Sequence, residues 1–103
     1  MADRGWKKNE RRIAAVLGGE RVPVSGRGDG PDVAHAWLSI ECKHRASIPA
    51  WLKDALQQAR KAARDGQLPV AVLHEAGKHD SIVAMKLSDF RDWFMGEADA
   101  EEV

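Results

Sequence analysis

The chain has 103 residues, of which 44% are hydrophobic and 31% charged, a balance that is ordinary for one globular domain with a single core. No apolar run approaches the roughly 20 residues of a membrane span, and the N-terminus has no apolar signal segment, so we expect a cytoplasmic protein without membrane contact. The single cysteine, Cys42, excludes an internal disulfide and a cysteine cluster for zinc, which fits a reducing cytosol.

A net charge of zero hides an uneven distribution of charge along the chain. Residues 1–64 contain 13 of the 16 basic residues and 7 of the 16 acidic ones, so the acidic excess falls in residues 65–103. A basic region of this kind favours a nucleic-acid partner, because phosphates attract it. The alternative is that the two regions interleave in the folded protein and leave no basic surface.

An amphipathic helix is predicted from Asp3, which can cap it, to Leu17, where two glycines stop it. Glu10 falls on the apolar stripe of this helix, between Trp6 and Ile13. A glutamate on a buried face is costly unless it has a partner, so an inward Glu10 needs a partner there. The alternative is a glutamate at the margin of the stripe that reaches solvent or pairs with an arginine.

A short strand is predicted over residues 21–25, followed by a loop over residues 26–30. The loop has three glycines in five residues, which makes a regular helix or strand unfavourable there. The glycines do let backbone N–H groups approach a phosphate. It could equally be a plain surface loop. Asp29 in this loop is a rival to Asp32 as a functional carboxylate, but its position is less fixed, so Asp32 is preferred.

The segment from Pro31 to Arg45 carries the strongest chemical pattern. Residues 38–43 alternate between apolar and polar, which predicts a strand that places Glu41 and Lys43 on the same face. If residues 32–35 pair with residues 39–43, Asp32 and Glu41 converge. Two carboxylates and a lysine at one place suit Mg²⁺-dependent phosphodiester hydrolysis. Alternatively, Glu41 and Lys43 form only a surface ion pair worth under about 1 kcal/mol.

The longest predicted helix opens near Pro49 and reaches Gly66. Gln58 shares a row with apolar residues, which predicts that it points at a sheet. Gln57 shares a row with basic residues that are expected to be solvated or to contact DNA. Of the two glutamines, the helical spacing therefore selects Gln58 as the inward one.

The C-terminal third predicts a hairpin and a short helix. Residues 69–74 form a continuous apolar run, typical of a strand covered on both faces, and residues 81–87 alternate and pair with it. Ser88 is expected to cap a last helix whose aromatic side chains face inward. Residues 97–103 form an acidic tail that is expected to be disordered, so residues 1–96 are predicted to be one domain.

Pro31-Asp32, an eight-residue spacer and Glu41-Cys42-Lys43 resemble the motif of the PD-(D/E)XK nuclease superfamily. The predicted order of elements, αβββαββα from about Trp6 to Phe94, is similar to that of archaeal-type and phage Holliday-junction resolvases. The resemblance implies an α/β fold with a resolvase-like, restriction-endonuclease-like core, in which helices flank a mixed central sheet.

The function implied by the resemblance is a Mg²⁺-dependent DNA endonuclease, with Mn²⁺ as a possible substitute. The first expectation is a Holliday-junction resolvase that acts as a homodimer on four-way or otherwise branched DNA, with Trp37 or Trp51 as candidates for the dimer surface. One alternative is a nicking, repair or restriction-like nuclease on duplex or flap DNA. Another is a DNA-binding module that keeps the fold without catalysis.

The resemblance also assigns roles to particular residues. The expected metal ligands are Asp32, Glu41, the backbone carbonyl of Cys42 and, through a water, Glu10. Lys43 would orient the attacking water, Ser25 would lie near the scissile phosphate, and Gln58 would reach back to the site. Ser25 could instead be a turn serine and Gln58 a structural amide. Basic side chains expected to contact DNA are Lys7, Arg11, Arg27, His44, Arg45, Lys53, Arg60 and Arg64.

Overall fold

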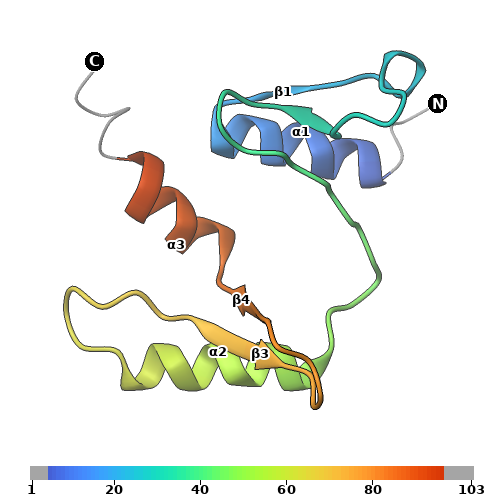
Figure 1. The fold of residues 1–103 in the computed structure, drawn as a ribbon. Helices are drawn as coiled ribbons and strands as arrows, with labels where there is room; N and C mark the ends of the chain where they lie inside the picture. Colours follow the sequence, from blue (N-terminus) through green and yellow to red (C-terminus); the bar gives the residue numbers. More distant parts are fainter. Residues whose placement is uncertain (1–4, 97–103) are drawn as a thin grey trace. The chain divides into compact units, whose positions relative to one another are not determined.

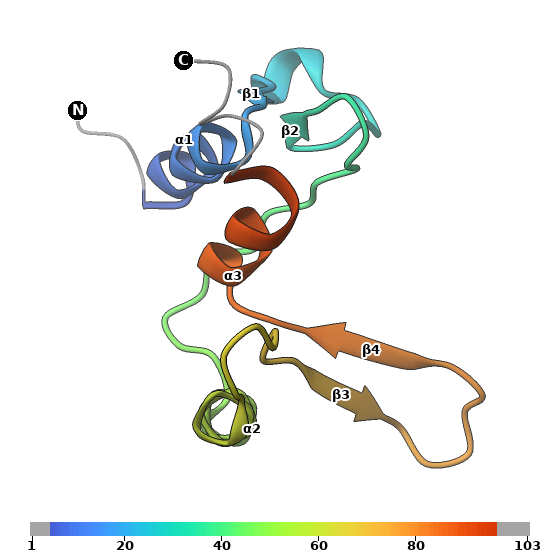
Figure 2. The ribbon, with the colours of Figure 1, turned by 90° about the vertical axis from the view of Figure 1, so that its left-hand side faces the viewer.

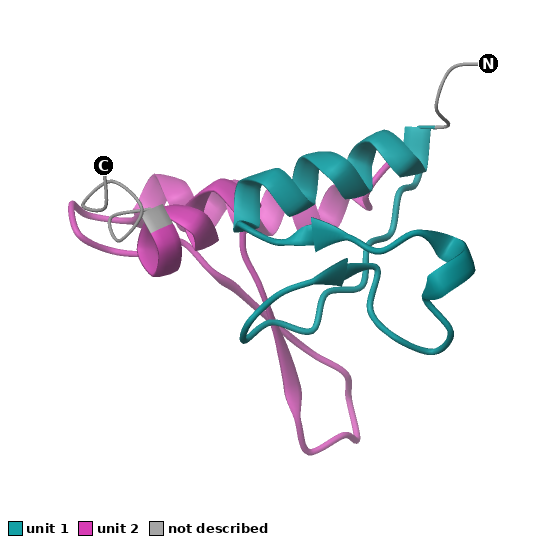
Figure 3. Cartoon of the chain, turned by 90° about the horizontal axis from the view of Figure 1, so that it is seen from above, with its two compact units in different colours: residues 1–46 teal, residues 47–103 magenta. Residues whose placement is uncertain are grey.

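The computed structural model describes residues 5–96, which form a mixed α/β structure with three α-helices and two small antiparallel sheets. The chain divides into two compact units, Met1–Ala46 and Ser47–Val103, coloured separately in Figure 3. The single domain over residues 1–96 therefore stays a prediction, and the predicted acidic tail at 97–103 lies outside the described residues, as does the predicted cap Asp3.

Helix α1 (Gly5–Leu17) forms where the apolar periodicity predicts a helix. It ends as predicted at Gly18, whose φ of 73° is a conformation that favours glycine. The next residue, Gly19, donates its N–H to the carbonyl of Ala14 at 2.9 Å, which closes the last turn as a Schellman motif. The apolar side of α1 buries Ala14 and Leu17.

Strand β1 (Glu20–Arg21) pairs antiparallel with β2 (Val33–Ala34), and α1 runs beside β1 (Figure 1). The prediction of a strand over residues 21–25 was wrong in its extent, because the strand ends at Arg21. Pro23 has no N–H to donate to a ladder, and Val24–Gly26 instead form a single 3₁₀ turn, η1. Val33 is fully buried at the centre of this unit.

The strand predicted over residues 38–43 is reduced to one antiparallel bridge between Val33 and Ile40. The backbone N–H of Asp32 donates to the carbonyl of Ile40 at 2.9 Å. Beyond this point the ladder stops, because the N–H of Cys42 donates to the Asp32 carboxylate at 2.7 Å rather than to a backbone carbonyl. The predicted pairing of residues 32–35 with residues 39–43 is thus observed at one bridge. Beyond it, the Asp32 side chain takes the place of a backbone acceptor.

His35 ties the end of α1 to the turn that follows β2. Its Nε2 lies 2.8 Å from the carbonyl oxygen of Leu17, and its Nδ1 accepts the N–H groups of Trp37 and Leu38, each at 3.2 Å. Because Nδ1 accepts two hydrogen bonds, the proton of the neutral ring belongs on Nε2, which then donates to Leu17. His35 therefore satisfies a helix-terminal carbonyl and fixes the turn that leads to residues 40–43.

In the second unit, α2 (Ala50–Ala62) is followed by the predicted hairpin of β3 (Ala71–His74) and β4 (Ser81–Ala84) (Figure 2). The helix is shorter than predicted because Ala63 is already extended, with a ψ of 134°. The expectation that the strand over residues 69–74, here β3, is covered on both faces was wrong. Val72 is 64% exposed and its cross-strand neighbour Val83 is 57% exposed, because this sheet has only two strands.

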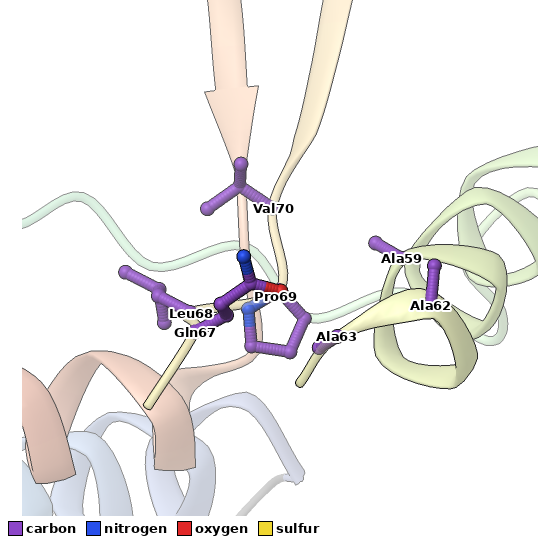
Figure 4. A pocket seen from close by; sticks show the side chains of 7 residues that line it. All are labelled: Ala59, Ala62, Ala63, Gln67, Leu68, Pro69 and Val70. Atoms are coloured by element: carbon purple, nitrogen blue, oxygen red, sulfur yellow. The ribbon is translucent and has the colours of Figure 1, made fainter. Parts of the chain in front are cut away.

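A shallow hollow of about 430 Å³ lies between the end of α2 and the segment leading to β3 (Figure 4). The small side chains of the helix leave this space open. None of its lining residues is charged, so the hollow offers no acid, base or metal ligand. It is lined by Ala59, Ala62, Ala63, Gln67, Leu68, Pro69 and Val70.

Helix α3 (Leu87–Arg91) continues into a π-helical turn, η2 (Asp92–Gly96). The prediction that Ser88 caps this helix was wrong, because the extended Lys86 occupies the N-cap position and contributes no side-chain cap. Trp93 and Phe94 are each about half exposed rather than turned inward. Within residues 5–96, no helix has both the length and the apolar character that crossing a membrane requires.

Candidate functional site

An open hollow of about 320 Å³ in the first unit gathers the residues of the predicted motif. We call it the carboxylate pocket. Three acidic side chains, three basic ones and a histidine line it together with two apolar residues and a cysteine. The lining residues are Trp6, Glu10, Val24, Arg27, Asp32, Glu41, Cys42, Lys43, His44 and Arg45.

Asp32 is the fixed centre of the carboxylate pocket. The residue is 5% exposed, and its backbone is hydrogen-bonded on both sides, to Val22 and to Ile40. Its Oδ1 accepts from Arg27 at 2.8 Å and its Oδ2 accepts from the N–H of Cys42 at 2.7 Å. Both carboxylate oxygens are therefore held in place, as a preorganised ligand or a structural ion pair requires.

Glu10 enters the pocket from α1 and is 4% exposed, so the predicted inward orientation is confirmed. Its Oε1 accepts from Arg21 Nε at 2.8 Å and from Arg27 Nη2 at 3.0 Å. The alternative in which Glu10 pairs with arginine is therefore also observed. Without these partners the buried carboxylate would be strongly unfavourable.

Arg27 joins the two buried carboxylates. One terminal nitrogen binds Asp32, and the other binds both Glu10 and the carbonyl of Val22, the latter at 2.6 Å. The hydrogen bond to Glu10 is the main cause that raises the pKa of Arg27 above its ordinary value. The remaining donor, Nε, is buried without a hydrogen-bond partner. Arg27 thus lies among acidic groups and does not face outward as an arginine that binds DNA would.

Glu41 and Lys43 form the exposed rim of the carboxylate pocket. The antiparallel bridge between Val33 and Ile40 places Glu41 directly across from Asp32, so the predicted convergence of the two carboxylates is observed. The Lys43 ammonium lies 3.1 Å from the Glu41 carboxylate, and both side chains are more than 60% exposed. The surface ion pair foreseen as an alternative is therefore present, and by itself it contributes little to stability.

Cys42 lies between these two rim residues. Burial raises the pKa of its thiol above the ordinary value, and the negative charge of Asp32 raises it further. The role of its backbone carbonyl as a metal ligand stays a prediction. The observed role of the residue is to donate its N–H to Asp32.

The raised pKa predicts that Cys42 is alkylated by iodoacetamide more slowly in the folded protein than in urea-unfolded protein at pH 8, because the thiolate is the nucleophile. In the folded protein, the alkylation rate of Cys42 should rise at a higher pH than it does in the unfolded protein. Since folding disfavours the thiolate, this contribution to stability is present below the unfolded pKa and is lost as pH rises through the folded pKa. Faster alkylation of the folded protein would contradict the prediction.

Two of the predicted catalytic residues, Ser25 and Gln58, do not line the carboxylate pocket. Ser25 is exposed within η1 and does not line the pocket, although its neighbour Val24 does. Gln58 belongs to the second unit and is exposed, so the predicted orientation toward a sheet is not observed. Helical spacing fixed which residues share a face of α2, but it could not show which face is covered.

The basic residues expected to contact DNA differ in their surroundings. His44 and Arg45 follow Lys43 on the rim, and both are exposed. Lys7 lies beside Trp6 on α1, with its ammonium 5.5 Å from the ring centre. In the second unit Arg60 pairs with Asp89. The remaining members of the set, Arg11, Lys53 and Arg64, are exposed.

The sequence interpretation missed the role of Arg21 and assigned Arg27 to DNA. Arg21 lies 11 residues from its partner Glu10, and only the tertiary fold of α1 against β1 brings them together. The signal that could have found them is the buried glutamate itself, because a carboxylate on an apolar helix face needs a cation. Arg21 and Arg27 were the nearest basic residues beyond the helix.

The donor set of the carboxylate pocket fits a hard divalent cation in its chemistry. Glu10 and Asp32 already bind one cationic group, the guanidinium of Arg27, which marks the place where their charges converge. Among residues 5–96, no three acidic, histidine or cysteine side chains have the arrangement of a metal site as they now stand. The residues that would hold the ion are Asp32, Glu41 and Glu10.

Comparisons of the chain with protein families, with curated proteins and with solved structures find no match.

Proposed function

We propose that this protein is a Mg²⁺-dependent DNA endonuclease of the PD-(D/E)XK type, with a four-way junction as its first candidate substrate. The observation that supports the proposal most is the position of Asp32 directly across from Glu41, with Lys43 at the same pocket. The three side chains come from the Pro-Asp and Glu-Cys-Lys segments that resemble the nuclease motif. We further infer that the two small sheets belong to a resolvase-like core.

The acidic residues of the carboxylate pocket and Lys43 each have a role in this proposal. Asp32 is held rigidly by its hydrogen bond from Cys42 and contributes an oriented oxygen ligand, while the exposed Glu41 contributes a second. When bound, Mg²⁺ would activate water and stabilise the charge that develops on the phosphate. Lys43 would exchange its ion pair with Glu41 for a contact with the attacking water or the phosphate. Glu10 would assist from the buried side.

The rim also provides a surface for the DNA backbone. Lys43, His44 and Arg45 are consecutive and exposed, and all three line the carboxylate pocket. Side chains on both sides of an extended segment can reach phosphates along a strand of DNA without reading its sequence. This arrangement supports a structure-directed nuclease rather than a sequence-specific one.

A junction resolvase requires two active sites that are related by symmetry. A chain of 103 residues offers one carboxylate pocket within residues 5–96, so cleavage of both strands at a junction would require a homodimer. Trp51, which is 61% exposed in the second unit, stays a candidate for the dimer surface.

One observation favours a second candidate function. The buried carboxylates are neutralised by Arg21 and Arg27, and Glu41 pairs with Lys43, so the acidic groups have partners without any metal. A protein that uses these pairs only for stability would be a DNA-binding module of the same fold without catalysis. The two candidates differ in whether divalent metal produces cleavage.

Cleavage of defined DNA substrates tests the proposal. The purified protein is incubated with Mg²⁺ or Mn²⁺ and with a four-way junction, a flap or a linear duplex, and products are resolved on denaturing gels. Paired symmetric cuts in the junction alone are expected for a resolvase. Cutting of all three substrates would assign a general nuclease, whereas binding without cutting in either metal would assign the module and refute the nuclease.

Lys43→Ala is expected to reduce single-turnover cleavage by at least about 100-fold, because a positioned charge that acts in the transition state is lost. The fold should be unaffected, since the Lys43 side chain is 65% exposed. Metal affinity should not fall, because Lys43 is no metal ligand. Lys8→Ala, which removes an exposed lysine of α1 outside the pocket, is the matched control. Normal turnover of Lys43→Ala would remove this lysine from the mechanism.

A further inference from the structure

The geometry points to Arg27 as a built-in counter-cation of the carboxylate pocket, which a divalent metal must displace in order to bind. The inference rests on the proposed metal site and concerns its regulation. Arg27 contacts Asp32 at 2.8 Å and Glu10 at 3.0 Å, so its guanidinium now neutralises two of the expected ligands. A cation between the same oxygens and the guanidinium cannot be present together, because their charges repel at contact distance.

The hydrogen bonds of Arg27 show that this position is incompletely satisfied. The two terminal nitrogens of Arg27 donate three hydrogen bonds, to Asp32, Glu10 and the carbonyl of Val22, but Nε is buried and has no acceptor. A buried donor without an acceptor loses its hydration without compensation. Arg27 therefore neutralises the buried carboxylates, yet its unpaired Nε carries a cost that displacement would relieve.

The backbone around Arg27 permits such a displacement. Arg27 follows η1 and precedes Gly28, whose φ is 53°, and Gly30 completes the turn with an N–H donated to the Arg27 carbonyl at 2.8 Å. Neither Arg27 nor its neighbours in this loop belong to a strand. The side chain can therefore leave the carboxylates without breaking the ladder between β1 and β2.

Displacement also accounts for the expected contact of Arg27 with DNA, which its observed contacts with Glu10 and Asp32 do not show. A guanidinium released from Glu10 and Asp32 lies next to the exposed rim formed by Lys43, His44 and Arg45, where a DNA phosphate would bind. Guanidinium groups bind phosphate oxygens in a forked geometry. Metal binding would thus exchange the Arg27–carboxylate contacts for an Arg27–phosphate contact.

Metal affinity in the absence of DNA tests this inference. In titration calorimetry with MnCl₂ and MgCl₂, Arg27→Gln should bind the ion at least about tenfold more tightly than the wild type, because removal of a full charge at contact distance exceeds the free energy of a tenfold change. Arg21→Gln is the matched control. It removes the same charge and another partner of Glu10 but leaves the bridge to Asp32, so its gain in affinity should be clearly smaller.

Thermal unfolding provides a second readout. Arg27→Gln should unfold at a lower temperature than the wild type without metal, and Mn²⁺ should raise its Tm more than it raises that of the wild type. Arg27→Lys keeps the positive charge but cannot bridge two carboxylates with a rigid fork. Its Mn²⁺ affinity should therefore lie between those of the wild type and Arg27→Gln. If Arg27→Gln does not fold, Arg27→Lys carries the test.

The outcomes separate the two proposals. Tighter Mn²⁺ binding by Arg27→Gln or Arg27→Lys than by Arg21→Gln supports displacement. Measurable and equal Mn²⁺ affinity in the wild type and both Arg27 variants would overturn displacement while the metal site stands. If neither the wild type nor any variant binds Mn²⁺ or Mg²⁺, the metal site is refuted, and displacement with it.

Discussion

Glu41→Gln is expected to abolish metal-dependent cleavage while it changes the free energy of unfolding by no more than about 0.5 kcal/mol. The Glu41 side chain is 61% exposed and its contact in the structure is an exposed ion pair with Lys43, which contributes little to stability. Its replacement by the isosteric amide removes one anionic ligand and adds no bulk. Binding of junction DNA without metal should persist, because the amide adds no negative charge to the rim.

Asp32→Asn makes the matched comparison, because it removes the carboxylate across from Glu41 but from a buried position. Cleavage should again be lost. Stability should now fall by about 2 kcal/mol, because the Asp32 carboxylate receives a charge-assisted hydrogen bond from Arg27 and a second one from the N–H of Cys42. The asparagine oxygen can keep only one of these partners well.

Urea unfolding, gel-shift binding and cleavage assays on the two variants measure these effects. Cleavage by Glu41→Gln at the wild-type rate would refute its role as a ligand. Equal losses of stability in both variants would contradict the burial difference between Asp32 and Glu41. Loss of cleavage in both, with loss of stability in Asp32→Asn alone, would show that one carboxylate serves both fold and chemistry.

The elements of this fold that the sequence predicted are those with local signals. Apolar periodicity and the two glycines at 18 and 19 located α1 and its end. A continuous apolar run located β3, and alternating residues located β4. The predicted ends of the strands were less accurate, because the hydrogen-bond partners of each backbone group decide where a strand ends. Pro23 ended β1 early, and the Asp32 side chain took the N–H of Cys42 that a longer ladder would have used.

The candidate site was predictable where one strand pairing decided it. Pairing of residues 32–35 with residues 39–43 required only the alternation and a short turn, and it placed Asp32 across from Glu41 as observed. The arginines were not predictable in the same way. Arg21 and Arg27 reach Glu10 through the packing of α1 on β1, and no residue spacing encodes that distance. The predicted inward orientation of Gln58 was wrong for a related reason, since periodicity does not reveal which face of a helix is covered.

Gly19→Ala is expected to cause the largest loss of stability of any small substitution in the first unit, about 3 kcal/mol, with a fall in Tm of more than about 10 °C. A Cβ atom at Gly19 would lie 2.4 Å from the backbone oxygen of Ala34 and 2.9 Å from Cγ1 of Val33. The first of these atoms belongs to the backbone of β2 and cannot rotate away. Either β2 moves or the end of α1 moves.

Gly18→Ala is the matched control, because it adds the same methyl group one residue earlier. At Gly18 nothing lies within 4 Å of the added Cβ, but its φ of 73° disfavours alanine and should cost about 1 kcal/mol. The two variants thus separate steric crowding from backbone strain in one thermal-unfolding experiment. If Gly19→Ala were no less stable than Gly18→Ala, the close approach of α1 to β2 would be wrong. The burial of Glu10 beside Asp32, which depends on that approach, would then lose its basis.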